Sequence, residues 1–136
     1  MKIEVVKRFT FEAAHFLPEY KGACANMHGH TYVLDVGIKG EIDPKTGMVM
    51  DFTALKQMVK VYILDELDHK LLNEVYSHNF PYGRPTAENM VVWILKRLKS
   101  YMRSYKLFYG GSDISFIRLY ETQNSYVEWR EKNKNE

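Results

Sequence analysis

Apolar and polar side chains alternate along two long stretches of the chain, which predicts two β-strands. In residues 2–16 the apolar row ends in a histidine, and it consists of Phe9, Phe11, Ala13 and His15. Residues 28–40 begin with histidines and continue into an apolar row, formed by His28, His30, Tyr32, Leu34, Val36 and Ile38. Because side chains at positions i and i+2 of a strand share a face, both rows predict buried faces that end in imidazoles.

A period of three to four residues in two other stretches predicts helices. The first apolar stripe consists of Leu55, Met58, Val59, Tyr62 and Ile63, after a start that Asp51 or Thr53 can cap. The second helix opens at Pro85-Thr86, with Thr86 as its cap, and ends near residues 101–105. Its buried stripe is expected at Val91, Ile94, Leu95 and Leu98. Each helix therefore has one face suited to packing on a sheet.

The remaining pattern predicts three further strands. A turn at residues 45–47 precedes a short apolar strand at 48–50, residues 114–121 alternate, and residues 125–130 return as a hairpin across Asn124. The element order is ββ(β)ααββ. It predicts an α+β fold with both helices on one face of an antiparallel sheet.

Composition describes a single domain over residues 1–136, with a polar tail at 130–136 that is expected to fray. Hydrophobic residues make up 46% and charged residues 26%, and no stretch resembles a signal peptide or a membrane span. A cytoplasmic protein without a membrane partner is therefore expected. The net charge of +2 comes from interspersed charges, which argues against nucleic-acid binding. The single cysteine excludes an internal disulfide and favours a reducing compartment.

The three histidines on the two buried rows predict a zinc site. His28 and His30 leave one face of a strand, and His15 ends the neighbouring row. Three such ligands are typical of zinc sites that keep one coordination position open. A single histidine on an apolar face is more often a hydrogen-bonded core residue, but three together favour the metal. Cys24 could instead complete a closed structural site as a fourth ligand, because it lies only four positions before His28.

Two further features carry candidate chemistry. The adjacent pair Asp68-His69 suits proton transfer, because a carboxylate can orient and charge an imidazole, although such pairs also occur in solvated loops. Glu121 ends the strand row that contains Ile117 and Leu119, where a carboxylate is costly unless it is paired or binds a ligand. It is suited to hold the N–H pair of a guanine or pterin edge, and the alternative is a strand-end carboxylate in water. His78 is expected at the surface.

Six short motifs, in order and along nearly the whole chain, resemble the family of 6-pyruvoyl-tetrahydropterin and 6-carboxy-tetrahydropterin synthases. They are Phe11-Glu12-Ala13-Ala14-His15, Cys24-x-x-x-His28-Gly29-His30, Gly47-Met48-Val49-Met50-Asp51-Phe52, Leu67-Asp68-His69, Pro85-Thr86-x-Glu88-Asn89 and Tyr120-Glu121-Thr122. The resemblance implies the tunnelling (T-fold) architecture, in which a sheet and two helices from each subunit form a barrel. It also implies a homohexamer of two trimers with active sites at subunit interfaces.

The resemblance further implies a role for each candidate residue. His15, His28 and His30 become the zinc ligands, Cys24 the proton-abstracting base, and Glu121 the pterin anchor. Asp68 and His69 become the dyad that works with Cys24. The implied substrate is a small molecule, 7,8-dihydroneopterin triphosphate, and Lys21 and Arg118 are candidates to bind its triphosphate.

Two products are possible from this substrate. In the family the carboxy type tends to have three residues between its cysteine and the HGH motif and the pyruvoyl type five, and here there are three, Ala25, Asn26 and Met27. The spacing favours 6-carboxy-tetrahydropterin of the 7-deazaguanine (queuosine-type) route, with loss of triphosphate and acetaldehyde. The alternatives are a 6-pyruvoyl-tetrahydropterin synthase and a zinc-stabilised pterin-binding protein without turnover.

Overall fold

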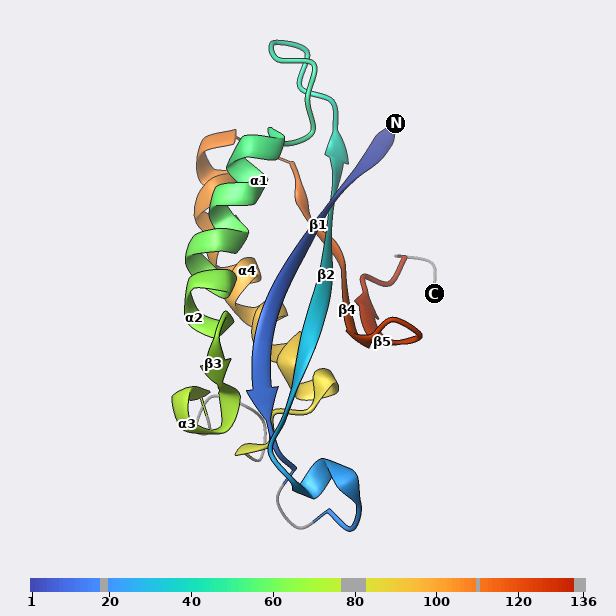
Figure 1. Ribbon diagram of the computed structural model, residues 1–136. Coiled ribbons are helices and arrows are strands. Elements are labelled where there is room, and N and C mark those ends of the chain that lie inside the picture. Colours follow the sequence, from blue (N-terminus) through green and yellow to red (C-terminus); the bar gives the residue numbers. More distant parts are fainter. Residues whose placement is uncertain (18–19, 77–82, 110, 134–136) are drawn as a thin grey trace.

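In the described part of the chain, the long helices α1 and α4 pack on one face of a five-stranded sheet (Figure 1), which has the strand order β3-β1-β2-β4-β5. The computed structural model describes residues 1–17, 20–76, 83–109 and 111–133. The strands are β1 (Lys2–His15), β2 (His28–Glu41), β3 (Lys70–Leu71), β4 (Asp113–Thr122) and β5 (Ser125–Arg130). Every pairing is antiparallel except that of β3 with β1. The expected α+β fold with helices on one face is confirmed.

Strands β1 and β2 form a long antiparallel pair whose register sets the site. His15 lies opposite His28, and Ala13 lies opposite His30. The inward rows continue the apolar pattern, and Phe11, Tyr32 and Leu34 are all buried. The Phe11 and Tyr32 rings stack with centroids 4.9 Å apart. The alternation in the sequence therefore indicated correctly which face of both strands is buried.

The first helical region runs without interruption through α1 (Phe52–Val59), the π-helical turn η2 (Lys60–Leu64) and α2 (Asp65–Leu67). Asp51 caps it, because its carboxylate accepts the Thr53 backbone N–H at 2.7 Å. The second helix, α4 (Ala87–Tyr109), begins where Thr86 accepts the Asn89 backbone N–H at 3.2 Å. It extends beyond the expected end at 101–105. Two short elements, η1 (Ala23–Ala25) and α3 (Leu72–Tyr76), complete the described fold.

Two features of the fold differ from the sequence expectation. Residues 48–50 form no strand, and their apolar character reflects packing, because Met50 is buried and Val49 is half-buried against the core. The additional strand is instead β3, which pairs with Ala13 and Ala14 over only two residues. A pairing this short leaves no alternation to read. At the other end of the chain, Arg130 belongs to β5 and lies opposite Phe116.

None of the described helices combines the length and the apolar character needed to cross a bilayer. His78, expected at the surface, lies outside the described residues.

Candidate metal centre and proton-transfer pair

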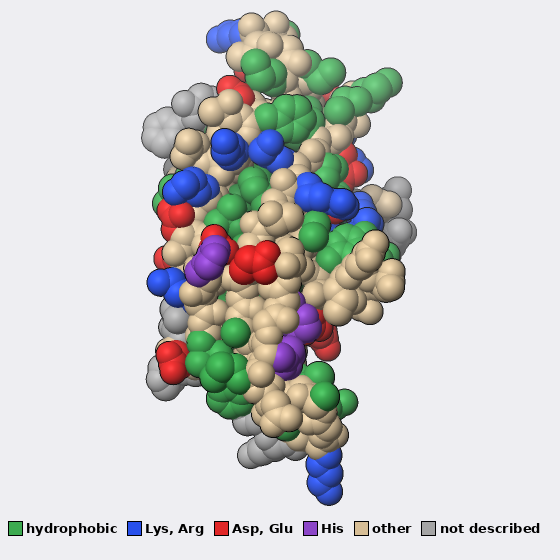
Figure 2. Space-filling model, in the orientation of Figure 1, with side chains coloured by type: hydrophobic (Ala, Val, Ile, Leu, Met, Phe, Trp, Pro, Cys, Tyr) green, Lys and Arg blue, Asp and Glu red, His purple; other side chains and the backbone are tan. Residues whose placement is uncertain are grey.

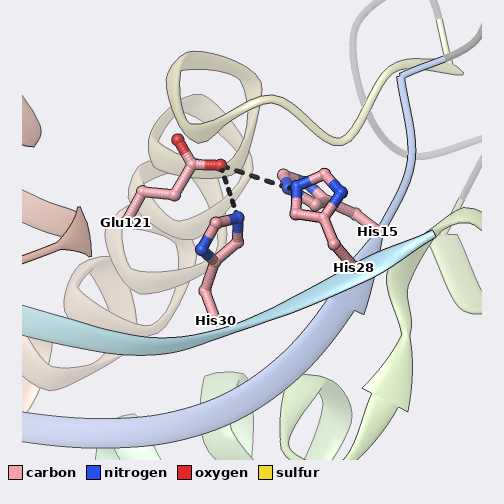
Figure 3. A group of neighbouring side chains, drawn as sticks. All are labelled: His15, His28, His30 and Glu121. Atoms are coloured by element: carbon pink, nitrogen blue, oxygen red, sulfur yellow. Dashed lines mark hydrogen bonds and ion pairs between the residues drawn. The ribbon is translucent and has the colours of Figure 1, made fainter. Parts of the chain in front are cut away.

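The paired strands bring three histidines and one glutamate to the same end of the sheet (Figure 3). His15 ends β1, while His28 and His30 begin β2. Strand β4 runs antiparallel to β2 with Tyr120 opposite Val33, so that Glu121 follows toward the histidine end of β2. One ligand atom from each of the four side chains lies within 4.8 Å of the other three. The site is therefore fixed by strand register.

The four side chains point at one another. His15 Nε2 is 3.0 Å from His28 Nε2 and 3.1 Å from the Oε1 oxygen of Glu121. The same oxygen is 3.2 Å from His30 Nε2, and the three imidazole rings are mutually edge-on. Donor atoms from three strands thus surround a common centre (Figure 3).

Hydrogen bonds at the outer ring nitrogens define the tautomers of two histidines. His15 Nδ1 lies 2.7 Å from the Pro85 carbonyl, and His28 Nδ1 lies 2.7 Å from the Asn26 carbonyl. A carbonyl only accepts hydrogen bonds, so each Nδ1 carries the proton and donates it. In the neutral rings the two Nε2 atoms then face each other with lone pairs. Such carbonyl contacts orient metal-binding histidines and leave Nε2 for the metal.

The cluster favours positive charge at its centre. Burial acts to lower the pKa of His15, but hydrogen bonds with Glu121 and the Pro85 carbonyl outweigh it and raise that pKa. The hydrogen bond with His15 in turn lowers the pKa of the Glu121 carboxyl. Burial lowers the pKa of His30, whose Nε2 is buried and forms no hydrogen bond of acceptable geometry among the described residues. A proton or a metal ion at the centre would satisfy these groups.

The donor set fits zinc. Three imidazole nitrogens and one carboxylate oxygen are common zinc ligands, and the orphaned His30 nitrogen and the facing lone pairs are what a bound cation would satisfy. The sequence suggested Cys24 as a possible fourth ligand. In the described part of the chain, the fourth converging donor is Glu121, and Cys24 is a half-buried free thiol in η1.

Asp68 and His69 lie apart from this cluster, on the β1 edge of the sheet. Asp68 Oδ1 accepts the Glu12 backbone N–H at 2.9 Å and lies 3.0 Å from His69 Nδ1. The Glu12 carbonyl accepts the His69 backbone N–H. The Glu12 N–H and the His69 ring lower the pKa of the Asp68 carboxyl. His69 has a backbone φ of +61°, the only positive value at a non-glycine position among the described residues.

These contacts make the pair suitable for proton transfer. An ionised Asp68 holds Nδ1–H of His69, which leaves Nε2 available to exchange a proton. A shallow groove of about 420 Å³ runs beside it, lined partly by His30, His69 and Lys70. The contact between Asp68 and His69 is present, at the edge of β1 that faces away from β2.

Some contacts of the site could not be inferred from the sequence. Glu121 was singled out as a buried-row carboxylate, but its contact with His15 and His30 depends on the β2–β4 register. The carbonyls of Asn26 and Pro85 carry no side-chain signal at all. The triphosphate candidate Arg118 is paired with Glu128, its Nε 2.9 Å from the carboxylate, and Lys21 lies exposed in the loop before η1.

Comparison with known proteins identifies the family of the chain. Residues 4–132 match the sequence family described as 6-pyruvoyl tetrahydropterin synthase. The chain belongs to this family. It is 38% identical to the 6-carboxy-5,6,7,8-tetrahydropterin synthase of Haemophilus influenzae, over 94% of this chain and 99% of that protein. It is 31% identical to the 6-pyruvoyl tetrahydrobiopterin synthase of Drosophila melanogaster, over 93% of this chain and 78% of the relative.

A solved structure of the same family has the same fold. The structure of Caenorhabditis elegans 6-pyruvoyl tetrahydropterin synthase superposes with a TM-score of 0.79 at 26% identity, covering 97% of both chains. The T-fold architecture expected from the six motifs is therefore confirmed for the subunit.

Proposed function

We propose that the protein converts 7,8-dihydroneopterin triphosphate to 6-carboxy-5,6,7,8-tetrahydropterin in a zinc-dependent reaction that releases triphosphate and acetaldehyde. Atoms balance when one water molecule is taken up. The observation that carries the proposal is the convergence of His15, His28, His30 and Glu121 in a member of the tetrahydropterin synthase family. The choice of product rests on the three residues between Cys24 and His28 and on the similarity to the Haemophilus 6-carboxy enzyme.

In this proposal His15, His28 and His30 hold the zinc ion, which supplies Lewis acidity toward the hydroxyl groups of the substrate side chain. Cys24 acts as a thiolate and removes a proton from that side chain. His69, oriented through Nδ1 by Asp68, exchanges a proton through Nε2. Glu121 accepts hydrogen bonds from the N–H groups of the pterin ring, which fixes the substrate against the zinc site.

The proposal includes an oligomer, a homohexamer of two trimers with active sites between subunits. Within one chain the groups expected to act together are spread over three places: η1, the β1 edge, and the ends of β1, β2 and β4. Figure 1 shows η1 beyond the lower ends of β1 and β2, whereas β3 lies beside the helices on the left. A site completed by a second subunit would account for this separation.

A 6-pyruvoyl-tetrahydropterin synthase is the second candidate, favoured by the similarity to the Drosophila enzyme. One experiment separates the candidates. Zinc-loaded protein is incubated with dihydroneopterin triphosphate, the pterin product is identified by mass, and acetaldehyde is measured alongside. The 6-carboxy product with acetaldehyde supports the proposal, while a pyruvoyl product without acetaldehyde supports the second candidate. Bound but unchanged substrate would indicate a pterin-binding protein.

A further inference from the structure

A groove lined by lysines lies directly beside Asp68, between the first helical region and the edge of the sheet. It has a volume of about 410 Å³, and its apolar lining consists of Phe9 and Leu64. Its charged lining consists of Lys56, Lys60, Lys70, Asp65 and Asp68. Figure 2 shows basic side chains gathered over this helical side of the molecule, with a histidine and acidic side chains below them. The groove is separate from the histidine cluster.

The π-helical turn accounts for part of this lining. Lys60 and Asp65 are five positions apart, and each residue of a regular α-helix turns by about 100°, so they would point to different sides. In η2 the Asp65 backbone N–H instead donates to the Lys60 carbonyl, five residues back. The wider turn brings the two side chains to one side, where Lys60 Nζ is 2.9 Å from Asp65 Oδ1. Such turns are frequent at functional sites.

The two carboxylates of the groove are already engaged. Asp65 pairs with Lys60, and Asp68 accepts hydrogen bonds from the Glu12 N–H and is in contact with His69. Lys56 and Lys70 have no carboxylate within salt-bridge distance in the described part of the chain. Two exposed ammonium groups thus line the groove together with the apolar side chains of Phe9 and Leu64. The unmatched charge favours an anion with several negative charges.

The groove also adjoins the proton-transfer pair. Asp68 lines the lysine groove, and the next two residues, His69 and Lys70, line the neighbouring groove beside His30. Lys70 is common to both grooves. An anion held by Lys56 and Lys70 would therefore lie next to the group that exchanges protons during release of a leaving group. We propose that this groove binds the triphosphate of the substrate, an inference that rests on the proposed function.

The assignment differs from the two candidates suggested by the sequence. Arg118 forms an ion pair with Glu128, and its guanidinium lies 4.8 Å from the centre of the Tyr126 ring, so its positive charge is already balanced by a carboxylate. Lys21 is exposed and has no second cation beside it among the described residues of its loop. Lys56 and Lys70 come from different elements and line one groove.

Direct binding of inorganic tripolyphosphate, measured by calorimetry, tests the assignment. Lys56→Ala and Lys70→Ala should each weaken this binding about fivefold to thirtyfold, because each removes a charge-assisted contact. The logarithm of the binding constant should also fall less steeply with the logarithm of salt concentration. Lys96→Ala, at an exposed position of α4, is the matched control and should bind tripolyphosphate like the unaltered protein. Lys70→Arg should retain most of the affinity.

Two further ligands separate this inference from the proposed function. For dihydroneopterin triphosphate, KM should rise in Lys56→Ala and Lys70→Ala, whereas unphosphorylated dihydroneopterin should bind them with unchanged affinity. Equal loss for both pterins, or unchanged tripolyphosphate binding, overturns the groove while the function stands. A change in subunit assembly in these variants, with unchanged tripolyphosphate affinity, would show that the lysines contact a second chain instead. Lysine-dependent tripolyphosphate binding without turnover would uphold the anion site and overturn the proposed reaction.

Discussion

The histidine cluster and the Asp68-His69 pair illustrate two ways of holding chemical groups. The cluster is built from three paired strands and is partly enclosed, because His15 is buried and His28, His30 and Glu121 are half-buried. The pair lies on the sheet edge, where the His69 side chain is 78% exposed, and it is held mainly by backbone contacts with Glu12. The first arrangement is complete within one chain. The second presents its groups outward.

This difference matches the chemistry expected of each region. Metal ligands must keep fixed mutual distances, and strand register together with carbonyl contacts at Nδ1 provides them. A proton-exchanging imidazole needs access to substrate, and exposure at an edge provides it. The comparison therefore predicts that substitutions in the cluster affect metal content, and those at the edge affect turnover.

The largest effect is expected for the metal ligands. His28→Ala and His30→Ala should each lose nearly all zinc, because only two imidazoles then remain beside the Glu121 carboxylate. Metal analysis of the purified variants, per mole of chain, measures this directly. Cys24→Ala should keep its zinc, since Glu121 rather than Cys24 lies among the converging donors. Full zinc content in both histidine variants would exclude the site.

Turnover should fall next most strongly when the outward groups are removed. Cys24→Ala and His69→Ala should lower kcat by about 10²- to 10⁴-fold and leave substrate Kd nearly unchanged, because general acid–base groups act mainly in the transition state. Both should retain zinc, in contrast to the histidine cluster. Single-turnover kinetics and equilibrium binding give the two constants.

A double variant and a mixing experiment examine how these two groups cooperate. If both serve one proton relay, the double variant should be little slower than the poorer single one. Fully multiplicative losses would show that they serve separate steps. If the site lies between subunits, unfolding the Cys24→Ala and His69→Ala proteins, mixing them and refolding them together should restore part of the activity. Some sites in the mixed oligomers then receive Cys24 from one chain and His69 from another.

An intermediate effect is expected at Glu121, which belongs to the enclosed region but is proposed to bind pterin. Removal of a buried hydrogen-bonding anchor costs about 2–4 kcal/mol. Glu121→Gln should therefore weaken pterin binding about 30- to 1000-fold while zinc content stays high. Calorimetry with the pterin and metal analysis are performed on the same sample. Loss of zinc with unchanged pterin affinity would identify Glu121 as a metal ligand, in agreement with its contacts to His15 and His30.

The enclosed region was the more predictable from sequence. The period of two in β1 and β2 placed three histidines on one buried face, because alternation fixes the side of a strand on which a residue lies. Alternation does not fix which residue of β4 lies beside which residue of β2. The approach of Glu121 to the histidines therefore required the strand register.

The edge region was less predictable because its contacts are local and irregular. The two-residue strand β3 leaves no periodic signal, and the apolar stripe through Tyr62 and Ile63 predicts a helix there but not its π-helical turn η2. Both elements contribute lining residues to the lysine groove. At Met48-Val49-Met50 the sequence predicted a strand that does not form. The apolar side chains of Val49 and Met50 pack against the core, but their backbone pairs with none of the described strands.

The smallest expected effect concerns the backbone of His69, whose φ of +61° is unfavourable for residues with a Cβ. The left-handed conformation costs about 1–2 kcal/mol for such residues, while glycine adopts it freely but loses more entropy on folding. His69→Gly should therefore be about 0.5–1 kcal/mol more stable than His69→Ala, a comparison in which both variants lack the imidazole. Denaturant unfolding measures the difference.

At Lys96, in the helical interior of α4, the order should reverse, with Ala more stable than Gly. The same order at both positions would show that the edge imposes no strain on His69. A reversal would show that His69 is kept in a conformation that stability alone disfavours, as expected of a residue retained for proton transfer.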